Sequence, residues 1–104
     1  MKQFAVIVHR TSKWDHSKSP EQQPGFGGHV AYMGGLEKSG AIALAGLMLP
    51  SNDVLFVFNA ESEAEVRAHF ASDPWQRSGV VRVERIEELA LRIANFGGSA
   101  AKQG

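Results

Sequence analysis

Histidine and aspartate occupy two positions of this 104-residue sequence at which each would serve proton transfer. His29 follows the glycine-rich stretch GFGG and begins a segment with helical periodicity. Asp73 lies where another helical segment must stop, in the stretch ASDPW. A histidine takes and returns a proton near neutral pH, and a carboxylate on its second ring nitrogen orients it and stabilises the imidazolium. The two residues are therefore candidates for a general acid–base pair.

Each of the two residues also has a purely structural interpretation. His29 would then cap its helix or pack at the helix start, and Asp73 would accept a local backbone amide, as aspartates before proline commonly do. A partner for Asp73 would explain why a carboxylate stands at the C-terminal end of a helix, which already carries partial negative charge. The sequence alone leaves both interpretations open.

Other side chains are candidates for a small-molecule site. His9 ends an apolar segment and would face either the site or the loop after it. Phe26, Tyr32, Met33 and Trp75 would line an apolar pocket or belong to the ordinary core. Histidines and carboxylates nowhere show the spacing of metal ligands, so the sequence predicts no metal and no cofactor. GFGG lacks the lysine of a phosphate-binding loop, and its glycines suit a hinge.

The overall composition excludes several classes of protein. Eleven basic and eleven acidic residues balance, which favours neither nucleic acid nor an anionic membrane as a partner. The chain has no cysteine, so it forms no disulfide, thiolate metal site or thiol nucleophile. The apolar run at residues 4–8 is too short for a signal sequence or a membrane span. We expect a cytoplasmic protein.

The segments that would position these residues alternate between strand and helix. Short apolar runs predict strands, and apolar positions spaced i, i+4, i+7 predict a helix that starts at His29. Ser62 begins a capping box for a second helix, and Pro74 must end that helix by Ser72. The expected elements are a strand at 4–8, a long loop at 9–28, a helix at 29–40, strands at 41–49 and 54–60, a helix at 62–72, a strand at 79–86, a short helix at 87–96 and a flexible tail at 97–104.

This order of elements predicts a single α+β domain over residues 1–96. The arrangement β-α-β-β-α-β is the ferredoxin-like one, with a four-stranded antiparallel sheet and its helices on one face. Residues 4–8 and 54–58 are apolar throughout, so both faces of these two strands are apolar. Because the helices cover only one face, we expect a homodimer through the sheet face, in which a second copy covers the other.

Two stretches of the chain resemble the YCII-related family. The stretch HVAYMGGLEKSGAIALAG, residues 29–46, has a histidine early in its helix, a glycine at the helix end and an Ala-Gly pair that closes the next strand. The stretch SEAEVRAHFASDPWQRSG, residues 62–79, has an acidic helix that closes in Asp-Pro-aromatic. An arginine common in the family three residues before the histidine is Phe26 here, and the proline usual after the Ala-Gly pair is Leu47.

The resemblance, which covers about residues 4–86, implies a ferredoxin-like domain that dimerises through its sheet as a dimeric α/β barrel. It also implies a pocket between helices and sheet in which His29 and Asp73 are the catalytic pair. Together with the residues named above, the Ala-Gly pair completes the set of substrate-binding candidates, which are His9, Phe26, Tyr32, Met33, Gly46 and Trp75.

We therefore expect a small enzyme that performs elimination, isomerisation or hydrolysis on a small organic molecule, cyclic compounds included. His29 would act as general base or acid, and Asp73 would orient it. The alternative is a non-catalytic dimeric module that binds a small molecule in the same pocket. Contact between the two side chains beside a cavity favours the enzyme, and an exposed Asp73 turned away from His29 favours the module.

Overall fold

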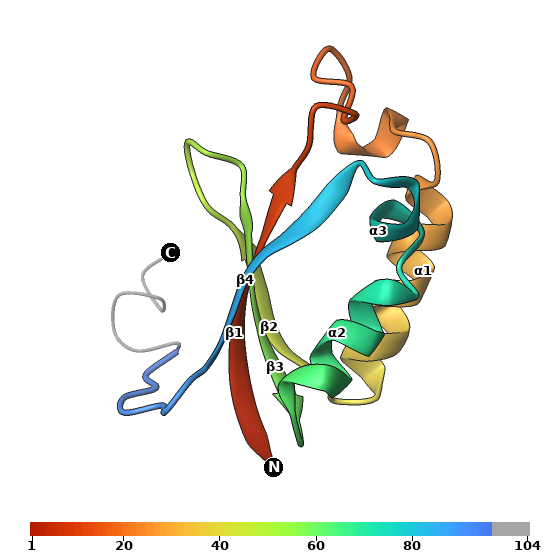
Figure 1. The fold of residues 1–104 in the computed structure, drawn as a ribbon. Coiled ribbons are helices and arrows are strands. Elements are labelled where there is room, and N and C mark those ends of the chain that lie inside the picture. The colour runs from red at the N-terminus through yellow and green to blue at the C-terminus, as the bar shows by residue number, and fades with distance from the viewer. Residues whose placement is uncertain (97–104) are drawn as a thin grey trace.

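The fold is a four-stranded antiparallel sheet with its helices on one face, as the sequence predicts (Figure 1). The structure is a computed structural model and describes residues 1–96. The strand order β2-β3-β1-β4 is that of the ferredoxin-like fold. The elements are β1 (Lys2–Arg10), the 3₁₀ helix η1 (Pro20–Gln22), α1 (Phe26–Lys38), β2 (Ile42–Leu47), β3 (Val54–Ala60), α2 (Glu63–Ala71), α3 (Pro74–Ser78) and β4 (Val81–Glu88).

The two central strands carry the core on the face beneath the helices. Alternate residues of a strand point to opposite faces, so every second side chain of β1 faces the helices. These side chains lie opposite apolar partners on β3, and Phe70 of α2 packs edge-on against the β3 phenylalanines. The register pairs Phe4 with Phe58, Val6 with Phe56, and Val8 with Val54.

Helix α1 begins earlier than predicted. Its N-cap is Gly25, whose φ of 81° lies in the left-handed region that glycine adopts without strain. The stretch GFGG therefore supplies the N-cap and the first turn of α1. The end of the helix is as predicted, because Gly40 has φ 83° and its N–H bonds Glu37 O while Ala41 N–H bonds Leu36 O.

Helix α2 ends at Ala71, as the proline rule predicts, but the chain then starts a new helix that was not predicted. Asp73 is the N-cap of α3, and its side chain accepts the Trp75 N–H, while Pro74 takes the first helical position. A carboxylate is favourable at a helix N-terminus, so the predicted repulsion of Asp73 by the preceding helix end is offset. At the start of α2, the Ser62 hydroxyl accepts the Glu65 N–H as predicted, but the Glu65 side chain bonds the N–H of Glu61 in place of that of Ser62.

Two other predictions differ from the structure. Residues 87–96 do not form the predicted helix, because β4 continues to Glu88, which lies opposite Phe4 of β1, and Leu89 N–H still bonds Gln3 O. Strand pairing thus outweighs the weak helical pattern of that segment. The flexible tail predicted at 97–104 lies outside the described residues.

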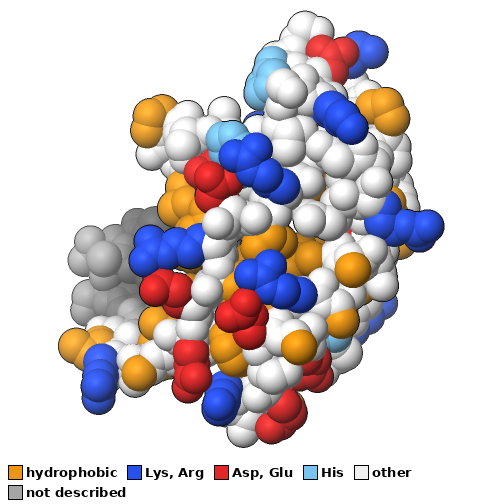
Figure 2. Space-filling model, viewed as in Figure 1, with side chains coloured by type: hydrophobic (Ala, Val, Ile, Leu, Met, Phe, Trp, Pro, Cys, Tyr) orange, Lys and Arg blue, Asp and Glu red, His pale blue; other side chains and the backbone are white. Residues whose placement is uncertain are grey.

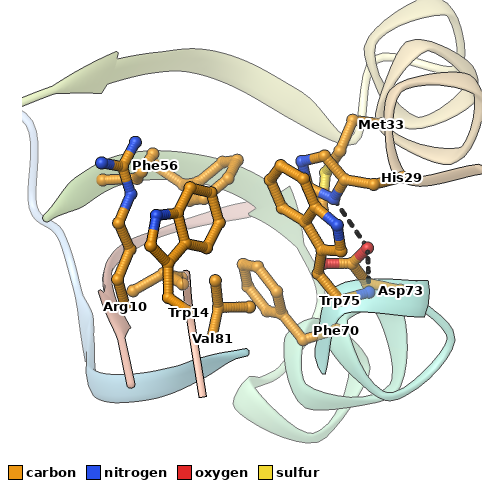
Figure 3. A pocket seen from close by; sticks show the side chains of 11 residues that line it. Arg10, Trp14, His29, Met33, Phe56, Phe70, Asp73, Trp75 and Val81 are labelled. Atoms are coloured by element: carbon orange, nitrogen blue, oxygen red, sulfur yellow. Dashed lines mark hydrogen bonds and ion pairs between the residues drawn. The ribbon is translucent and has the colours of Figure 1, made fainter. Parts of the chain in front are cut away.

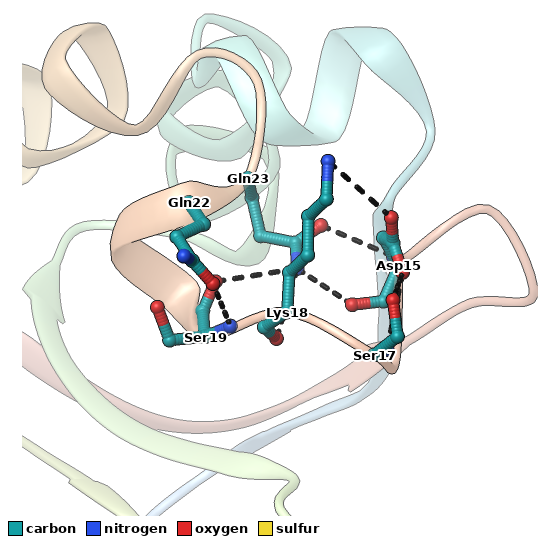
Figure 4. Close-up of polar contacts among 6 residues, drawn as sticks. All are labelled: Asp15, Ser17, Lys18, Ser19, Gln22 and Gln23. Carbon is teal, nitrogen blue, oxygen red and sulfur yellow. Dashed lines mark hydrogen bonds and ion pairs between the residues drawn. The ribbon is translucent and has the colours of Figure 1, made fainter.

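The long loop between β1 and α1, residues 11–25, is tied together by its own polar groups (Figure 4). The buried side chain of Gln23 accepts from Asp15 N–H and donates to Asp15 O at 2.7 Å. Ser19 N–H bonds the Gln22 side chain. The indole of Trp14 is buried in the core. The loop is therefore part of the folded structure over the core.

The two edge strands of the sheet differ in character. Strand β4 presents alternating charges to solvent, and Figure 2 shows both signs gathered over it, with Arg82 paired to Glu84. Strand β2, of sequence IALAGL, carries no charge and is mostly exposed. Over residues 1–96, no helix is apolar enough and long enough to span a membrane.

Candidate functional site

The structure brings His29 and Asp73 into direct contact beneath the helices. Nδ1 of His29 lies 2.8 Å from Oδ1 of Asp73. The histidine comes from the first turn of α1 and the aspartate from the N-cap of α3, so the contact joins positions 44 residues apart. The side chains are 18% and 2% exposed, respectively. A hydrogen bond at this depth is shielded from water and fixes both groups.

The hydrogen bonds leave one tautomer of His29 compatible with an ionised Asp73. A carboxylate only accepts hydrogen bonds, and Asp73 Oδ1 also accepts the Trp75 N–H at 3.2 Å. Nδ1 of His29 must therefore carry the hydrogen that it donates to Asp73, which leaves a lone pair on Nε2. Within residues 1–96 no side-chain or backbone group hydrogen-bonds Nε2, so this nitrogen is available to a bound molecule.

Trp75 fixes the plane of the histidine ring. The two rings stack with centroids 3.8 Å apart and planes 13° from parallel. Trp75 is itself held by a hydrogen bond from its Nε1 to Pro24 O at 2.9 Å and by edge-on packing against Trp14. The imidazole is thus constrained through its face by Trp75 and through its edge by Asp73.

An apolar cavity of about 90 Å³ opens beside this pair (Figure 3). It is bounded by side chains of the sheet, of α1, α2 and α3, and of the loop before α1. In Figure 3, Arg10 and Trp14 lie on one side and the His29–Trp75 stack lies on the other. The lining residues are Val8, Arg10, Trp14, His29, Met33, Val54, Phe56, Phe70, Asp73, Trp75 and Val81.

A second, more open cavity lies between α1 and the edge strand β2. Its volume is about 460 Å³, and it shares His29, Met33 and Phe56 with the first. His29 therefore stands between a small apolar cavity and a larger hollow at the surface.

Of the six substrate-binding candidates, the structure brings two to the inner cavity, Met33 and Trp75. Phe26 packs against the side of Trp75, and the Tyr32 hydroxyl donates to His69 O at 2.7 Å. Gly46 lies on the exposed edge strand β2. These three residues do not line the cavity.

His9, the remaining candidate, forms a separate histidine–aspartate pair. Its Nδ1 lies 2.7 Å from Oδ1 of Asp53, with side chains 41% and 22% exposed. Strand alternation turns His9 to the face opposite Val8 and Arg10, so it cannot reach the cavity. It borders instead a polar hollow that also includes Thr11, Ser51 and Asn52.

Sequence reasoning missed two residues of the cavity, Arg10 and Trp14. Arg10 stands two positions after Val8 on β1, so strand alternation alone would have placed it on the core face. Its guanidinium carbon lies 4.3 Å from the centre of the Trp14 ring. For Trp14 the only signal was a large aromatic residue inside a polar loop. The cavity thus contains a cation that the sequence analysis had not considered.

Neither pair belongs to a metal-binding cluster. Among residues 1–96, no three histidines or carboxylates lie close enough together to hold a metal ion. What the site can do with its own groups is accept and donate a proton at His29 Nε2, in surroundings that are mainly apolar.

Comparison with known proteins identifies a shared fold. No protein-family model matches the chain, and no curated protein matches its sequence. Among solved structures, the chain is similar to 5-chloro-2-hydroxyhydroquinone dehydrochlorinase from Burkholderia phenoliruptrix AC1100, solved in complex with 2,5-dihydroxybenzoquinone. The TM-score is 0.61, with 16% identity, over 88% of this chain and 95% of the other.

Proposed function

We propose that this chain is one domain of a cytoplasmic, YCII-related enzyme that catalyses proton transfer on a small organic molecule without a cofactor. Cyclic compounds are included among its substrates, and the reaction is elimination, isomerisation or hydrolysis. The observation that carries the proposal is the buried 2.8 Å contact between His29 and Asp73, which lies beside an apolar cavity and leaves Nε2 free of partners within residues 1–96.

His29 acts first as the general base. The lone pair on Nε2 takes a proton from an O–H or C–H group of the bound substrate, or from water in a hydrolysis. The electrons left behind expel a leaving group in an elimination, or move to a neighbouring atom in an isomerisation. Nε2 then returns the proton to the leaving group or to the new position. Each cycle therefore restores the neutral histidine.

Asp73 stabilises the charge that forms on His29 in this step. The N-terminal end of α1 disfavours a cation on a residue of its first turn. The Asp73 carboxylate opposes that effect through the bond to Nδ1, and the mainly apolar surroundings strengthen their attraction. Asp73 is thus a positioning residue, and His29 is the group that touches the reacting atoms.

The structurally similar protein supports a reaction of this type. It is a dehydrochlorinase solved with a quinone, so the fold is compatible with elimination chemistry on a ring compound. Removal of a hydrogen halide requires a base for the proton and a pocket for the ring. His29 and the adjoining cavity would supply both in this chain.

The test is a reaction screen followed by matched substitutions. Small carbonyl, phenolic and halogenated ring compounds are incubated with the protein in D₂O, and NMR follows both hydrogen exchange and product formation. For any compound that reacts, His29→Gln should lower kcat/KM by about 10²-fold or more, and Asp73→Asn by about 10-fold or more. His9→Gln and Asp53→Asn are the controls, because they alter the exposed pair only.

Full kcat/KM in both His29→Gln and Asp73→Asn would show that the pair is not the proton-transfer site. Binding of compounds without exchange or turnover across the screen would favour the non-catalytic module instead. An equal loss in the His9 and His29 variants would point to a general effect on folding, which circular dichroism checks directly.

We further propose that two copies associate through the sheet face opposite the helices. The register places Ala5 opposite Val57 and Ile7 opposite Leu55 on that face, so apolar side chains gather at its centre. Sedimentation should show a dimer at micromolar concentration, and Leu55→Glu should convert it to a monomer because burying a carboxylate is unfavourable. Arg67→Glu, at an exposed position of α2 away from the sheet, is the control. A monomeric wild-type protein would refute this association.

A further inference from the structure

Arg10 is a cation at the cavity that has no carboxylate partner among residues 1–96. Seven ion pairs occur in this part of the chain, and none includes Arg10. The side chain is neither fully buried nor fully exposed. A guanidinium at the cavity without a carboxylate partner keeps its N–H donors available to an anionic group of a ligand.

Stacking on Trp14 holds Arg10 in a form suited to recognition. The guanidinium carbon lies 4.3 Å from the centre of the Trp14 ring. A stacked guanidinium uses its face against the aromatic ring and keeps the N–H donors on its edge. Those donors match the two oxygens of a carboxylate or the single oxygen of a phenolate.

Arg10 lines both the apolar cavity and the polar hollow that His9 borders. The polar hollow has further donors in Ser12, His16 and Asn52. The apolar cavity offers Phe56 and Phe70 instead. A ligand of the apolar cavity would bury an apolar body against these rings and direct a charged oxygen toward Arg10.

We infer that the site takes a single flat ring that carries an anionic oxygen, bound with that oxygen on Arg10 and the ring against the aromatic side chains. This deepens the proposed function and rests on it for the use of the cavity as a substrate site. The volume of about 90 Å³ matches at most a single ring inside the cavity. An engineered cavity of about 150 Å³ holds one benzene, so here part of the ring stays outside the cavity.

The test compares charged ligands with neutral ones of the same shape. Benzoate against benzamide tests a carboxylate, and 4-nitrophenolate against 4-nitroanisole tests a phenolate. Both tryptophans of the chain line the cavity, so quenching of their fluorescence reports binding, and calorimetry confirms it. We expect at least one anion of the two pairs to bind the wild-type protein about 10-fold more tightly than its neutral counterpart.

Substitutions test whether Arg10 causes the preference for the charged ligand. Arg10→Met should weaken binding of the preferred anion by about 10-fold or more and leave the neutral ligand unchanged. Arg10→Lys should retain part of the preference, because it keeps the charge and loses the planar fork. Arg67→Met, on α2, removes a remote arginine as the control. If Arg10→Met does not fold, Arg10→Lys and the salt dependence of wild-type binding decide the question.

Equal affinity of the wild-type protein for charged and neutral members of both pairs would overturn the inference. So would an unchanged preference in Arg10→Met. His29→Gln separates this inference from the proposed catalysis, because it should lower kcat/KM by about 10²-fold or more and still discriminate between charged and neutral ligands. His29→Gln and Asp73→Asn could both stay fully active while the protein still prefers the charged ligand. That result would contradict the proposed mechanism and leave the role of Arg10 supported.

Discussion

The chain contains two histidine–aspartate pairs that are nearly alike as contacts and very different as environments. His29 with Asp73 and His9 with Asp53 both join residues 44 positions apart. Their Nδ1–Oδ1 distances are 2.8 and 2.7 Å. The carboxylate of the first pair is almost completely buried, whereas both members of the second are accessible to solvent.

The difference lies in what surrounds each pair. His29 is stacked on Trp75 and borders the apolar cavity, and Asp73 has a second bond from a helix N-terminus. His9 borders a polar hollow that also includes Ser51 and Asn52. Solvent-exposed pairs contribute little energy and orient their members weakly, because water competes for both groups. A histidine–aspartate hydrogen bond therefore does not by itself identify a site of proton transfer.

The largest effect on stability is expected when Trp75, which stacks on His29 of the buried pair, is removed. Trp75→Ala should lower the free energy of unfolding by about 3–5 kcal/mol, because a large buried side chain is deleted. Trp75→Phe should lower the free energy of unfolding by a smaller amount. It loses the hydrogen bond to Pro24 O, but a ring still packs against His29. Urea denaturation measures both. A loss below about 1 kcal/mol in Trp75→Ala would contradict the central packing role of Trp75.

The next effect measures the two pairs directly. A double-mutant cycle of His29→Gln and Asp73→Asn should give a coupling energy of about 1–3 kcal/mol, since the loss of one partner leaves a buried polar group unsatisfied. The same cycle with His9→Gln and Asp53→Asn should give less than about 0.5 kcal/mol, as exposed pairs do. Equal coupling energies in the two cycles would remove the basis of the comparison.

A smaller effect concerns the loop that brings Trp14 to the buried pair. Gln23→Leu removes the bonds between the Gln23 side chain and the backbone of Asp15, and it should cost about 1 kcal/mol. NMR should show shifted signals for the His29 ring, because Trp14 packs edge-on against Trp75, and unchanged signals for His9. Shifted His9 signals together with unchanged His29 signals would contradict a role of Gln23 in placing Trp14 near the buried pair.

The smallest effect is the titration of a carboxylate that is accessible to solvent. A hydrogen bond from the Ser17 side chain lowers the pKa of Asp15, and the Ser17 backbone N–H adds to this. The bonds to ionised Asp15 therefore stabilise the fold above the ordinary aspartate pKa, and this contribution is lost as pH falls through the lowered value. Ser17→Ala should raise the pKa of Asp15 toward its ordinary value in an NMR titration. An unchanged pKa would show that Ser17 is not the cause.

Most of the fold was predictable because its signals are local. Apolar runs gave the four strands, and the left-handed glycine gave the end of α1 at Gly40. Pro74 gave the end of α2. The wrong predictions fall where a local signal competes with strand pairing or is ambiguous. Residues 87–88 joined β4 by pairing with β1, and GFGG formed helix because Gly25 provides the cap.

The candidate site was predictable only in part. His29 and Asp73 were selected by residue type and by resemblance, and the structure places them in contact, while their catalytic role is the proposal made above. Arg10 was predictable from strand alternation and was overlooked. The place of Trp14 in the cavity wall was not predictable. It depends on hydrogen bonds of Gln23 that hold the polar loop over the core.

The sequence by itself determined which segments become strand and helix, where α2 ends, and that a histidine and an aspartate stand at helix boundaries. These features depend on backbone conformation and on side chains only a few residues apart. Only the tertiary structure decided which of two histidine–aspartate pairs is buried. Burial is collective: it requires Trp75, the loop with Trp14 and the sheet to meet around His29, and no local pattern specifies contacts across such separations.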